Sequence, residues 1–224
     1  MEASIMESFN GKTIVLTGAT AGVGKETARQ LAKMGHCVAL VGRDAEKGRR
    51  VLDEISGQTR NNNLYFFRAD LSKQSDVRSL AGQLEESLSR VDVLLNNAGA
   101  IFFKRHYSAD GIEMTFALNH LNYFLLTHLL LDKLRMGRGA RIINVSSVAH
   151  KNAKVDFEDL YRENRYLAGW AAYSQSKLCN LMFTYLLAQK LHGTGITVNA
   201  LHPGFVNSRF GDNNKGFQIL ALQV

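Results

Sequence analysis

Six short apolar segments recur along the 224-residue chain, and stretches with helical spacing separate them. The expected strands cover residues 13–17, 37–41, 64–68, 91–95, 141–145 and 197–201. Continuous apolar strands that alternate with helices indicate a parallel sheet that is covered on both faces. The pattern therefore predicts an α/β fold, a doubly wound parallel sheet of the Rossmann-like type.

Helices are expected between these strands, over residues 25–34, 44–55, 72–88, 111–134 and 170–191. Asp44 and Ser72 are the expected N-caps of the second and third helices, because short polar side chains accept hydrogen bonds from a first helical turn. Residues 149–168 are polar with isolated aromatics, and we expect them to cross the surface near a site. The length fits a single domain over residues 1–224, without linkers or repeats.

The net charge of +7 does not indicate a nucleic-acid partner. It arises from 27 basic and 20 acidic residues that are mixed along the chain, as in residues 43–47. A nucleic-acid-binding protein would concentrate the basic excess on one face or arm. The seven histidines show no metal-ligand spacing, so we predict no metal site.

Cys37 and Cys179 fall in an apolar run and a helical stretch, where they resemble small buried hydrophobes rather than a disulfide framework. Residues 1–10 lack the basic segment and apolar core of a secretory signal. No run approaches the ~18 apolar residues of a membrane span. We therefore expect a reducing compartment and a location that is cytoplasmic or peripheral to an intracellular membrane.

A glycine-rich turn, TGATAGVG at residues 17–24, follows the first expected strand and opens a helix. Such glycines let the backbone turn sharply and let a pyrophosphate approach the helix N-terminus. Arg43 follows the second strand, where NAD-selective folds place an acid and a basic residue instead accommodates a 2′-phosphate. The sequence thus predicts a site for NADP(H), against the alternatives of a plain tight loop and an ordinary surface arginine.

Tyr173 and Lys177 lie four residues apart in the last expected helix, and therefore on one helical face. A nearby cation favours the ionised phenol, so we expect Lys177 to lower the pKa of Tyr173. A tyrosine tuned in this way can exchange a proton with a substrate oxygen near neutral pH. Taken alone, the spacing also fits a core aromatic beside a solvated amine.

With these motifs in register, the chain resembles the short-chain dehydrogenase/reductase family over residues 10–210. The matching patterns are TGxxxGxG at 17–24, NNAG at 96–99, Asn119, the serine pair at 146–147, YxxxK at 173–177 and PG at 203–204. Within the family, the chain is most similar to the retinol-dehydrogenase-like reductases. That similarity is carried by residues 9–12, 24–28, 68–71, 145–150, 173–180 and 201–204.

The resemblance implies a role for each motif. Tyr173 would exchange the proton, and Ser147 would hydrogen-bond the substrate oxygen. Lys177 would hold the nicotinamide ribose, and Asn119 would fix a water that resupplies protons. The residues implied to contact NADP(H) are Gly18, Thr20, Gly22, Val23, Gly24, Arg43, Asp70, Leu71, Asn97, Ala98, Gly99, Tyr173, Lys177, Pro203 and Gly204.

The implied activity is hydride transfer between NADP(H) and the carbonyl/alcohol pair of a small lipophilic substrate that is retinoid-, aldehyde- or steroid-like. Phe102, Phe103, Met114 and Phe205 can line an apolar pocket, but aromatic residues here are equally expected in the core. Family members also commonly form homodimers and homotetramers, which the resemblance implies for this chain.

Members of this group continue well past the PG motif, with a further helix and a seventh strand, whereas this chain ends at Val224. We therefore expect six strands, a missing seventh, and a domain that is incomplete at its C-terminus. Leu220, Leu222 and Val224 would form an apolar end without an obvious partner. The alternative function is a catalytically inactive shortened isoform or fragment that binds a dinucleotide or a partner.

Overall fold

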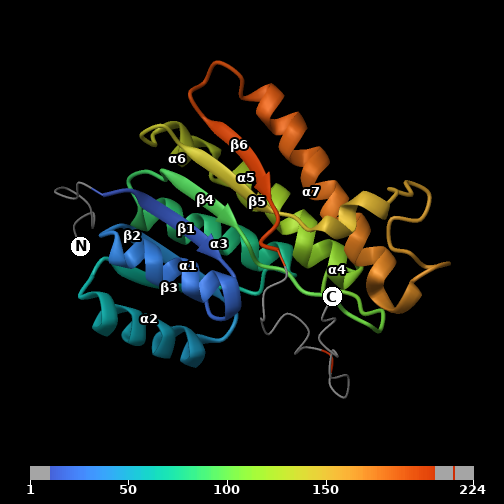
Figure 1. Ribbon diagram of the computed structural model, residues 1–224, viewed down its shortest axis with the longest axis horizontal. Coiled ribbons are helices and arrows are strands. Elements are labelled where there is room, and N and C mark those ends of the chain that lie inside the picture. The colour runs from blue at the N-terminus through green and yellow to red at the C-terminus, as the bar shows by residue number, and fades with distance from the viewer. Residues whose placement is uncertain (1–10, 205–213, 215–224) are drawn as a thin grey trace.

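The computed structural model describes residues 11–204 and residue 214. Its strands form one parallel sheet in the order β3-β2-β1-β4-β5-β6 (Figure 1). They are β1 (Thr13–Thr17), β2 (Cys37–Gly42), β3 (Leu64–Arg68), β4 (Val93–Asn96), β5 (Arg141–Val145) and β6 (Thr197–Leu201). The order reverses between β1 and β4, where doubly wound sheets bind their ligands. The predicted fold class is confirmed.

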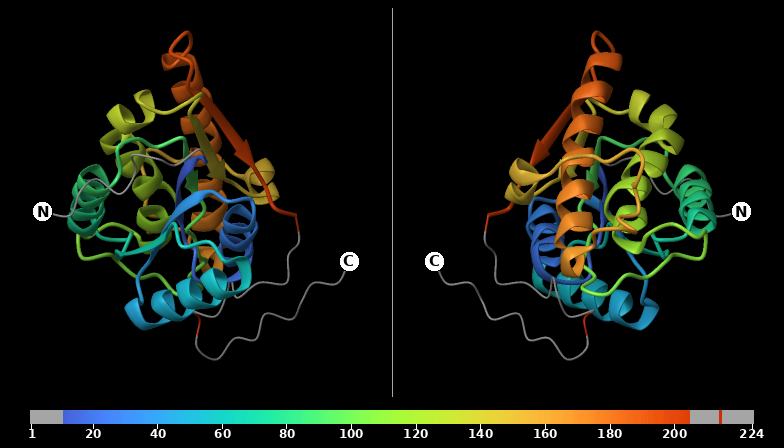
Figure 2. Two further views of the ribbon diagram at one scale, coloured as in Figure 1. Left: turned by 90° about the vertical axis from the view of Figure 1, so that its left-hand side faces the viewer. Right: turned by 90° about the vertical axis from the view of Figure 1, so that its right-hand side faces the viewer.

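Two helical layers pack on this sheet (Figures 1 and 2). Helices α3, α5 and α7 lie on one face of the sheet, and α1 and α2 lie on the other. Each of these two layers covers a separate cluster of apolar side chains. The helices are α1 (Gly22–Lys33), α2 (Ala45–Thr59), α3 (Gln74–Ser87), α4 (Met114–Phe116), α5 (Asn122–Leu129), α6 (Leu131–Arg135) and α7 (Trp170–Lys190).

The expectation that every strand is covered on both faces is wrong for β6 within the described residues. Val198 points into the α3/α5/α7 layer, so its neighbours along the strand point to the opposite face. There Thr197, Asn199 and Leu201 are exposed. The described part of the chain therefore buries β1 and β2 from both sides, but β6 from one.

The single helix predicted over 111–134 is broken in the structure. It begins at Met114, because the Glu113 carboxylate accepts from the backbone amides of Thr115 and Phe116 at 2.9 and 2.7 Å. A π-helical turn, Ala117–Leu121, then precedes α5. A second break at Leu130 separates α5 from α6. Widened π turns often occur at functional sites.

Other predicted boundaries shift for local reasons. Asp44 caps α2 as predicted, accepting from the Lys47 amide at 3.0 Å, but α2 continues to Thr59. Ser72 is not the cap of α3, because its hydroxyl donates instead to Asp70 Oδ1 at 2.7 Å. Strand β4 starts only at Val93, and the buried Asp92 carboxylate just before it accepts from the Thr13 and Arg138 amides.

The described residues include no helix long and apolar enough to cross a membrane. They also include no group of three His, Cys, Asp or Glu residues that could hold a metal ion. Cys37 and Cys179 are free and buried, as predicted. Predictions for residues 1–10, Phe205, Leu220, Leu222, Val224 and a seventh strand lie outside the described residues.

Candidate active site

The glycine-rich turn between β1 and α1 is packed too closely for side chains. Gly18 has a φ of 67°, and a Cβ there would meet the Ala98 Cα at 2.8 Å. A Cβ on Gly24 would meet the Gly18 carbonyl oxygen at 2.1 Å. Gly22, with a φ of 51°, is the exposed first residue of α1. The sequence therefore forms a tight backbone cradle at a helix N-terminus, the arrangement that binds a pyrophosphate.

Two side chains fasten this turn to the end of β4. The Thr17 hydroxyl accepts from the Asn97 and Ala98 amides at 2.9 and 3.0 Å. The Asn97 side chain donates to the Thr17 carbonyl at 2.9 Å and to that of Gly18 at 3.3 Å. The Asn97 amide group thus holds the turn, and its predicted contact with the cofactor stays a prediction.

Asn119 lies in the π turn and clamps the loop after β4. Its side chain exchanges two hydrogen bonds with the Ala100 backbone, both at 2.9 Å, and donates to Ser176 Oγ at 3.1 Å. A Cβ on Gly99 would meet Asn119 Oδ1 at 3.1 Å and Lys177 Nζ at 3.5 Å. Residues 99–100, 119 and 177, which are distant in sequence, therefore meet at one point.

Lys177 is 3% exposed, and its Nζ donates to the Val145 carbonyl oxygen at 2.9 Å. Burial lowers the pKa of this amine to about 7, because the charged form loses its hydration. The Nζ atom lies 5.8 Å from the ring centroid of Tyr173 and 5.9 Å from that of Tyr123. Lys177 can therefore gain and lose a proton near neutral pH beside two tyrosine rings.

Burial raises the pKa of Tyr173, and a hydrogen bond with Ser147 opposes the rise. The predicted lowering of this pKa by Lys177 is therefore wrong in direction for this structure. An amine with a pKa of about 7 carries only part of a charge at neutral pH. Desolvation of the phenol, which disfavours its ionised form, is the largest influence on the pKa of Tyr173. The Ser147–Tyr173 pairing itself, predicted as a catalytic set, is present.

Asn180 is a site residue that the sequence reasoning missed. Its side chain donates to the Asn119 carbonyl oxygen at 2.9 Å and pairs with His120 Nδ1 at 3.0 Å. It thereby fixes the π turn against α7. The sequence contains a signal for this position, because Asn180 follows Lys177 by three residues and the two side chains therefore lie near each other on the helix. The water predicted at Asn119 stays a prediction.

A buried polar ladder across the sheet was also missed. Asn96 Nδ2 donates to Thr127 Oγ1 at 3.1 Å and to Asn144 Oδ1 at 2.9 Å. Asn144 in turn donates to Thr184 Oγ1 at 3.0 Å. The two asparagines are register partners at the ends of β4 and β5. The ladder joins α5 and α7, which lie on the same face of the sheet, by way of β4 and β5.

The remaining predicted cofactor residues lie at carboxyl ends of strands or just beyond them. Thr20 packs against Gly42, and a Cβ added to Gly42 would meet the Thr20 Cγ2 atom at 2.8 Å. Arg43 is exposed after β2. The Asp70 carboxylate accepts from Ser72. Leu71 differs from these residues because its side chain is buried in the core cluster between the sheet and helices α3, α5 and α7. The others placed near this edge are Val23, Pro203 and Gly204.

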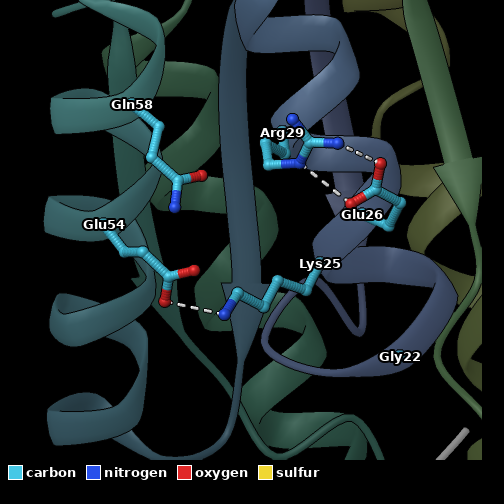
Figure 3. Close-up of a pocket in the computed structure, with 6 residues that line it drawn as sticks. All are labelled: Gly22, Lys25, Glu26, Arg29, Glu54 and Gln58. Atoms are coloured by element: carbon cyan, nitrogen blue, oxygen red, sulfur yellow. Dashed lines mark hydrogen bonds and ion pairs between the residues drawn. The ribbon is translucent and has the colours of Figure 1, made fainter.

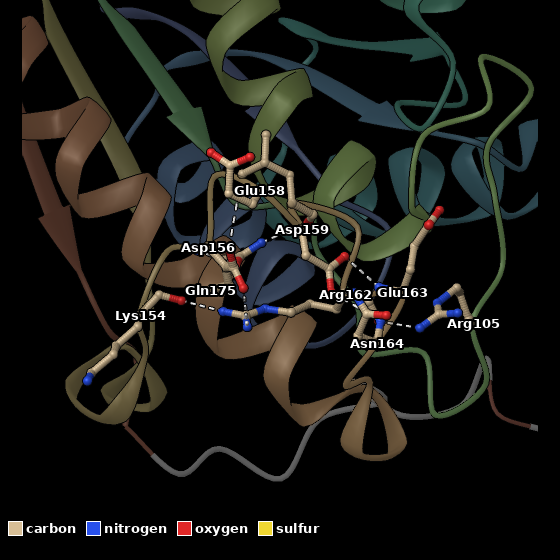
Figure 4. A network of polar contacts seen from close by, with 10 residues as sticks. Arg105, Lys154, Asp156, Glu158, Asp159, Arg162, Glu163, Asn164 and Gln175 are labelled. Carbon is tan, nitrogen blue, oxygen red and sulfur yellow. Dashed lines mark hydrogen bonds and ion pairs between the residues drawn. The ribbon is translucent and has the colours of Figure 1, made fainter.

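The segment predicted to cross the surface, residues 149–168, is anchored to α7 and to the loop after β4 (Figure 4). Gln175 accepts from the Asp156 amide at 3.3 Å and donates to the Leu160 carbonyl at 2.8 Å. Arg162 forms an ion pair with Asp156, and Arg105 donates to the Arg162 carbonyl. The segment thus lies beside α7, the helix that carries Tyr173 and Lys177.

An open depression of about 580 Å³ lies elsewhere, between α1 and α2 (Figure 3). Its charged side chains are paired, Lys25 with Glu54 and Arg29 with Glu26. The Arg29 hydrogen bond lowers the pKa of Glu26 to about 2. None of the predicted catalytic residues lines this depression, so it is not the reaction site.

Comparisons with known proteins agree with this geometry. A family model described as short chain dehydrogenase matches residues 12–217. Retinol dehydrogenase 13 of Homo sapiens is 44% identical over 201 residues, covering 90% of this chain and 61% of the relative. Retinol dehydrogenase 11 of Homo sapiens is 45% identical over 198 residues, covering 88% and 62%. The chain thus spans about three fifths of the length of these relatives.

Solved structures are similar over most of the chain. The Pseudomonas aeruginosa RhlG/NADP active-site complex is 31% identical with a TM-score of 0.74, and the match covers 89% of this chain and 74% of that one. A short-chain dehydrogenase from Sphingobium yanoikuyae in complex with NADPH is 25% identical with a TM-score of 0.73, and covers 89% and 73%.

Proposed function

Because this chain belongs to the short-chain dehydrogenase family, we propose that it transfers a hydride between NADP(H) and the carbonyl/alcohol pair of a small lipophilic substrate. The observation that carries the proposal is the convergence of Ser147, Tyr173, Lys177 and Asn119 at the carboxyl edge of the sheet. The similarity to retinol dehydrogenases supports a retinoid-like substrate, and we propose aldehyde- and steroid-like substrates as the alternatives.

The described residues fit NADP(H). The backbone cradle at Gly18 and Gly24 leaves no room for a Cβ, as a pyrophosphate site requires. Arg43 offers an exposed guanidinium for the 2′-phosphate. Lys177 lies beside Gly99, where it can contact the nicotinamide ribose. The two similar solved structures, which are complexes with NADP and with NADPH, support the same cofactor.

In this mechanism, a bound nicotinamide supplies or accepts the hydride. During reduction, Tyr173 donates its phenolic proton to the substrate oxygen, while Ser147 hydrogen-bonds that oxygen as negative charge develops. Lys177, with a pKa of about 7, is suited to return a proton to the tyrosine. Burial raises the pKa of Tyr173, so the phenol keeps the proton that the reduction step donates.

A turnover screen with the 224-residue chain tests the proposal directly. NADPH oxidation is followed with retinoid, aliphatic and aromatic aldehydes, steroids and quinones. We expect turnover with at least one lipophilic carbonyl. Tyr173→Phe should abolish turnover and keep NADPH binding, because only the proton donor is removed. An active Tyr173→Phe variant would contradict the assigned role.

The competing function is a catalytically inactive module that binds a dinucleotide or a partner. The position of β6 at the end of the sheet among the described residues favours it, because an edge strand offers backbone groups to another chain. The intact catalytic set argues against it. NADPH binding without turnover across the whole screen would support this alternative, and robust turnover would exclude it.

We also propose that the chain forms a homodimer or homotetramer through α5 and α7. Phe124 of α5 stacks near Phe183 of α7, with ring centroids 5.6 Å apart, and is 51% exposed. Tyr185 and Leu186 on α7 are 73% and 57% exposed. Exposed large apolar side chains on two helices in contact are typical of interaction surfaces. Light scattering should give a multiple of the 24.9 kDa chain, and Leu186→Glu should shift it toward the monomer.

The proposed location is cytoplasmic or peripheral to an intracellular membrane. The two free, buried thiols at Cys37 and Cys179 support a reducing compartment. Cell fractionation with a salt wash distinguishes the two locations, because a peripheral protein is released from membranes by the wash. Recovery in a secreted fraction would contradict both.

A further inference from the structure

Two arginines emerge side by side at the edge of the sheet where the cofactor is proposed to bind. Arg68 is the last residue of β3 and is the register partner of Gly42, the last residue of β2. Arg43 follows directly. The Arg68 Nε atom donates to the Arg43 carbonyl oxygen at 3.3 Å. Because Gly42 has no side chain, nothing from this position separates the two arginines.

Within the part of the chain that the structure describes, no carboxylate forms an ion pair with either guanidinium. The two nearest acids in sequence are occupied. Asp44 accepts from the Lys47 amide at 3.0 Å, and Asp70 accepts from the Ser72 hydroxyl at 2.7 Å. Arginine does not lose its charge in proteins. Both positive charges are therefore available to a bound anion.

We propose that Arg68 is a second guanidinium for the 2′-phosphate of NADP(H), together with Arg43. This inference rests on the function proposed above. A phosphate monoester carries a charge of about −1.5 to −2 near neutral pH and offers three acceptor oxygens. The bond to the Arg43 carbonyl uses the Arg68 Nε and leaves both terminal nitrogens for a planar, two-point contact. Arg68 is then a specificity residue for the phosphorylated cofactor.

The test is direct binding of NADPH and NADH to the full chain, followed by cofactor fluorescence. Arg68→Met should raise the dissociation constant for NADPH about tenfold, the usual effect of losing a charge-assisted hydrogen bond. The constant for NADH should stay within about twofold, since it has no phosphate at this position. Arg68→Lys should fall between the parent and Arg68→Met, because it keeps the charge and loses the planar fork.

Arg141→Met is the matched control. Arg141 is also exposed, but it is the first residue of β5 and so lies at the opposite edge of the parallel sheet. The Arg141→Met substitution removes the same charge as Arg68→Met, and it should leave the dissociation constants for NADPH and NADH unchanged. Competition by 2′,5′-ADP and 5′-AMP gives a second measurement, in which Arg68→Met should weaken only 2′,5′-ADP.

Two results would overturn the inference while the proposed function stands. One is an equal loss of NADPH and NADH affinity in Arg68→Met, which would place Arg68 against the adenosine that both cofactors share. The other is an unchanged NADPH preference in Arg68→Met when Arg43→Asp abolishes that preference. A parent chain that binds both cofactors equally would overturn the NADP(H) assignment and this inference together.

Discussion

The Lys177 amine donates to the Val145 carbonyl oxygen at 2.9 Å and thereby joins helix α7 to the last residue of strand β5. The contact holds an ionisable group in the protein interior, at the end of the sheet where Ser147 follows two residues later. The position of this amine has consequences for stability that are separable from catalysis.

Burial lowers the pKa of Lys177 from 10.5 to about 7, so the folded chain should become more stable as the pH rises. Between these two pH values the unfolded chain binds a proton that the folded chain does not. The free energy of unfolding should therefore increase by up to about 1.4 kcal/mol per pH unit from this group. Urea unfolding of the parent and Lys177→Met at pH 7, 8 and 9 measures the difference in slope. Lys190→Met, exposed on the same helix, should keep the parent slope, and a parent slope in Lys177→Met would refute the assignment.

Removing the Ser147 hydroxyl should slow catalysis and shift its pH dependence. The hydrogen bond from Ser147 lowers the pKa of Tyr173, so Ser147→Ala raises that pKa further. Alcohol oxidation, which needs the phenolate, should then reach its maximum at higher pH, with kcat lower by about 10²–10³-fold. Ser147→Thr keeps a hydroxyl and should retain most activity. A pH profile that is identical in the parent and Ser147→Ala would contradict this role.

Gly169→Ala and Gly35→Ala should differ in stability although both glycines have similar backbones, with φ values of 81° and 77°. A Cβ on Gly35 would meet nothing within 4 Å, so only the left-handed backbone costs stability, roughly 1–2 kcal/mol. A Cβ on Gly169 would meet the Phe102 carbonyl oxygen at 2.1 Å. Thermal unfolding should show the larger loss for Gly169→Ala, and equal losses would mean that the Phe102 loop moves without cost.

Tyr123→Phe should leave the protein as stable as the parent, or up to about 1 kcal/mol more stable, despite changing a fully buried residue. The Tyr123 hydroxyl finds no hydrogen-bond partner among the described residues, and burial raises its pKa. Phenylalanine keeps the ring that packs near Lys177 and removes only the unpartnered oxygen. Tyr123→Leu removes the ring and should be destabilising. A clear loss of stability in Tyr123→Phe would reveal a buried water or other partner at this hydroxyl.

Sequence patterns identified the strands well, because runs such as residues 13–17 are apolar, short and bounded by turn residues. These patterns predicted the wrong helix start where a side chain has two competing hydrogen-bond partners. Ser72 looks like an N-cap, but Asp70 two residues earlier captures its hydroxyl. The π turn around Asn119 could not be predicted either, because the spacing of apolar residues in this turn continues the spacing in the flanking helices.

The residues of the proposed catalytic set could be selected from the sequence because their spacing is characteristic, as with Tyr173 and Lys177. The direction of the Tyr173 pKa was not found, because burial depends on elements far away in the sequence. Arg68 was missed as a functional candidate for the same reason. It lies 25 positions from Arg43, and only the pairing of β2 with β3 brings the two together.

Gln175 sits between Tyr173 and Lys177 in sequence, yet it holds the neighbouring loop only through backbone atoms, the Asp156 amide and the Leu160 carbonyl. Mutations that change side chains in this loop leave both of those contacts available. Side chains in this loop can therefore vary over evolutionary time without loss of these two contacts to α7.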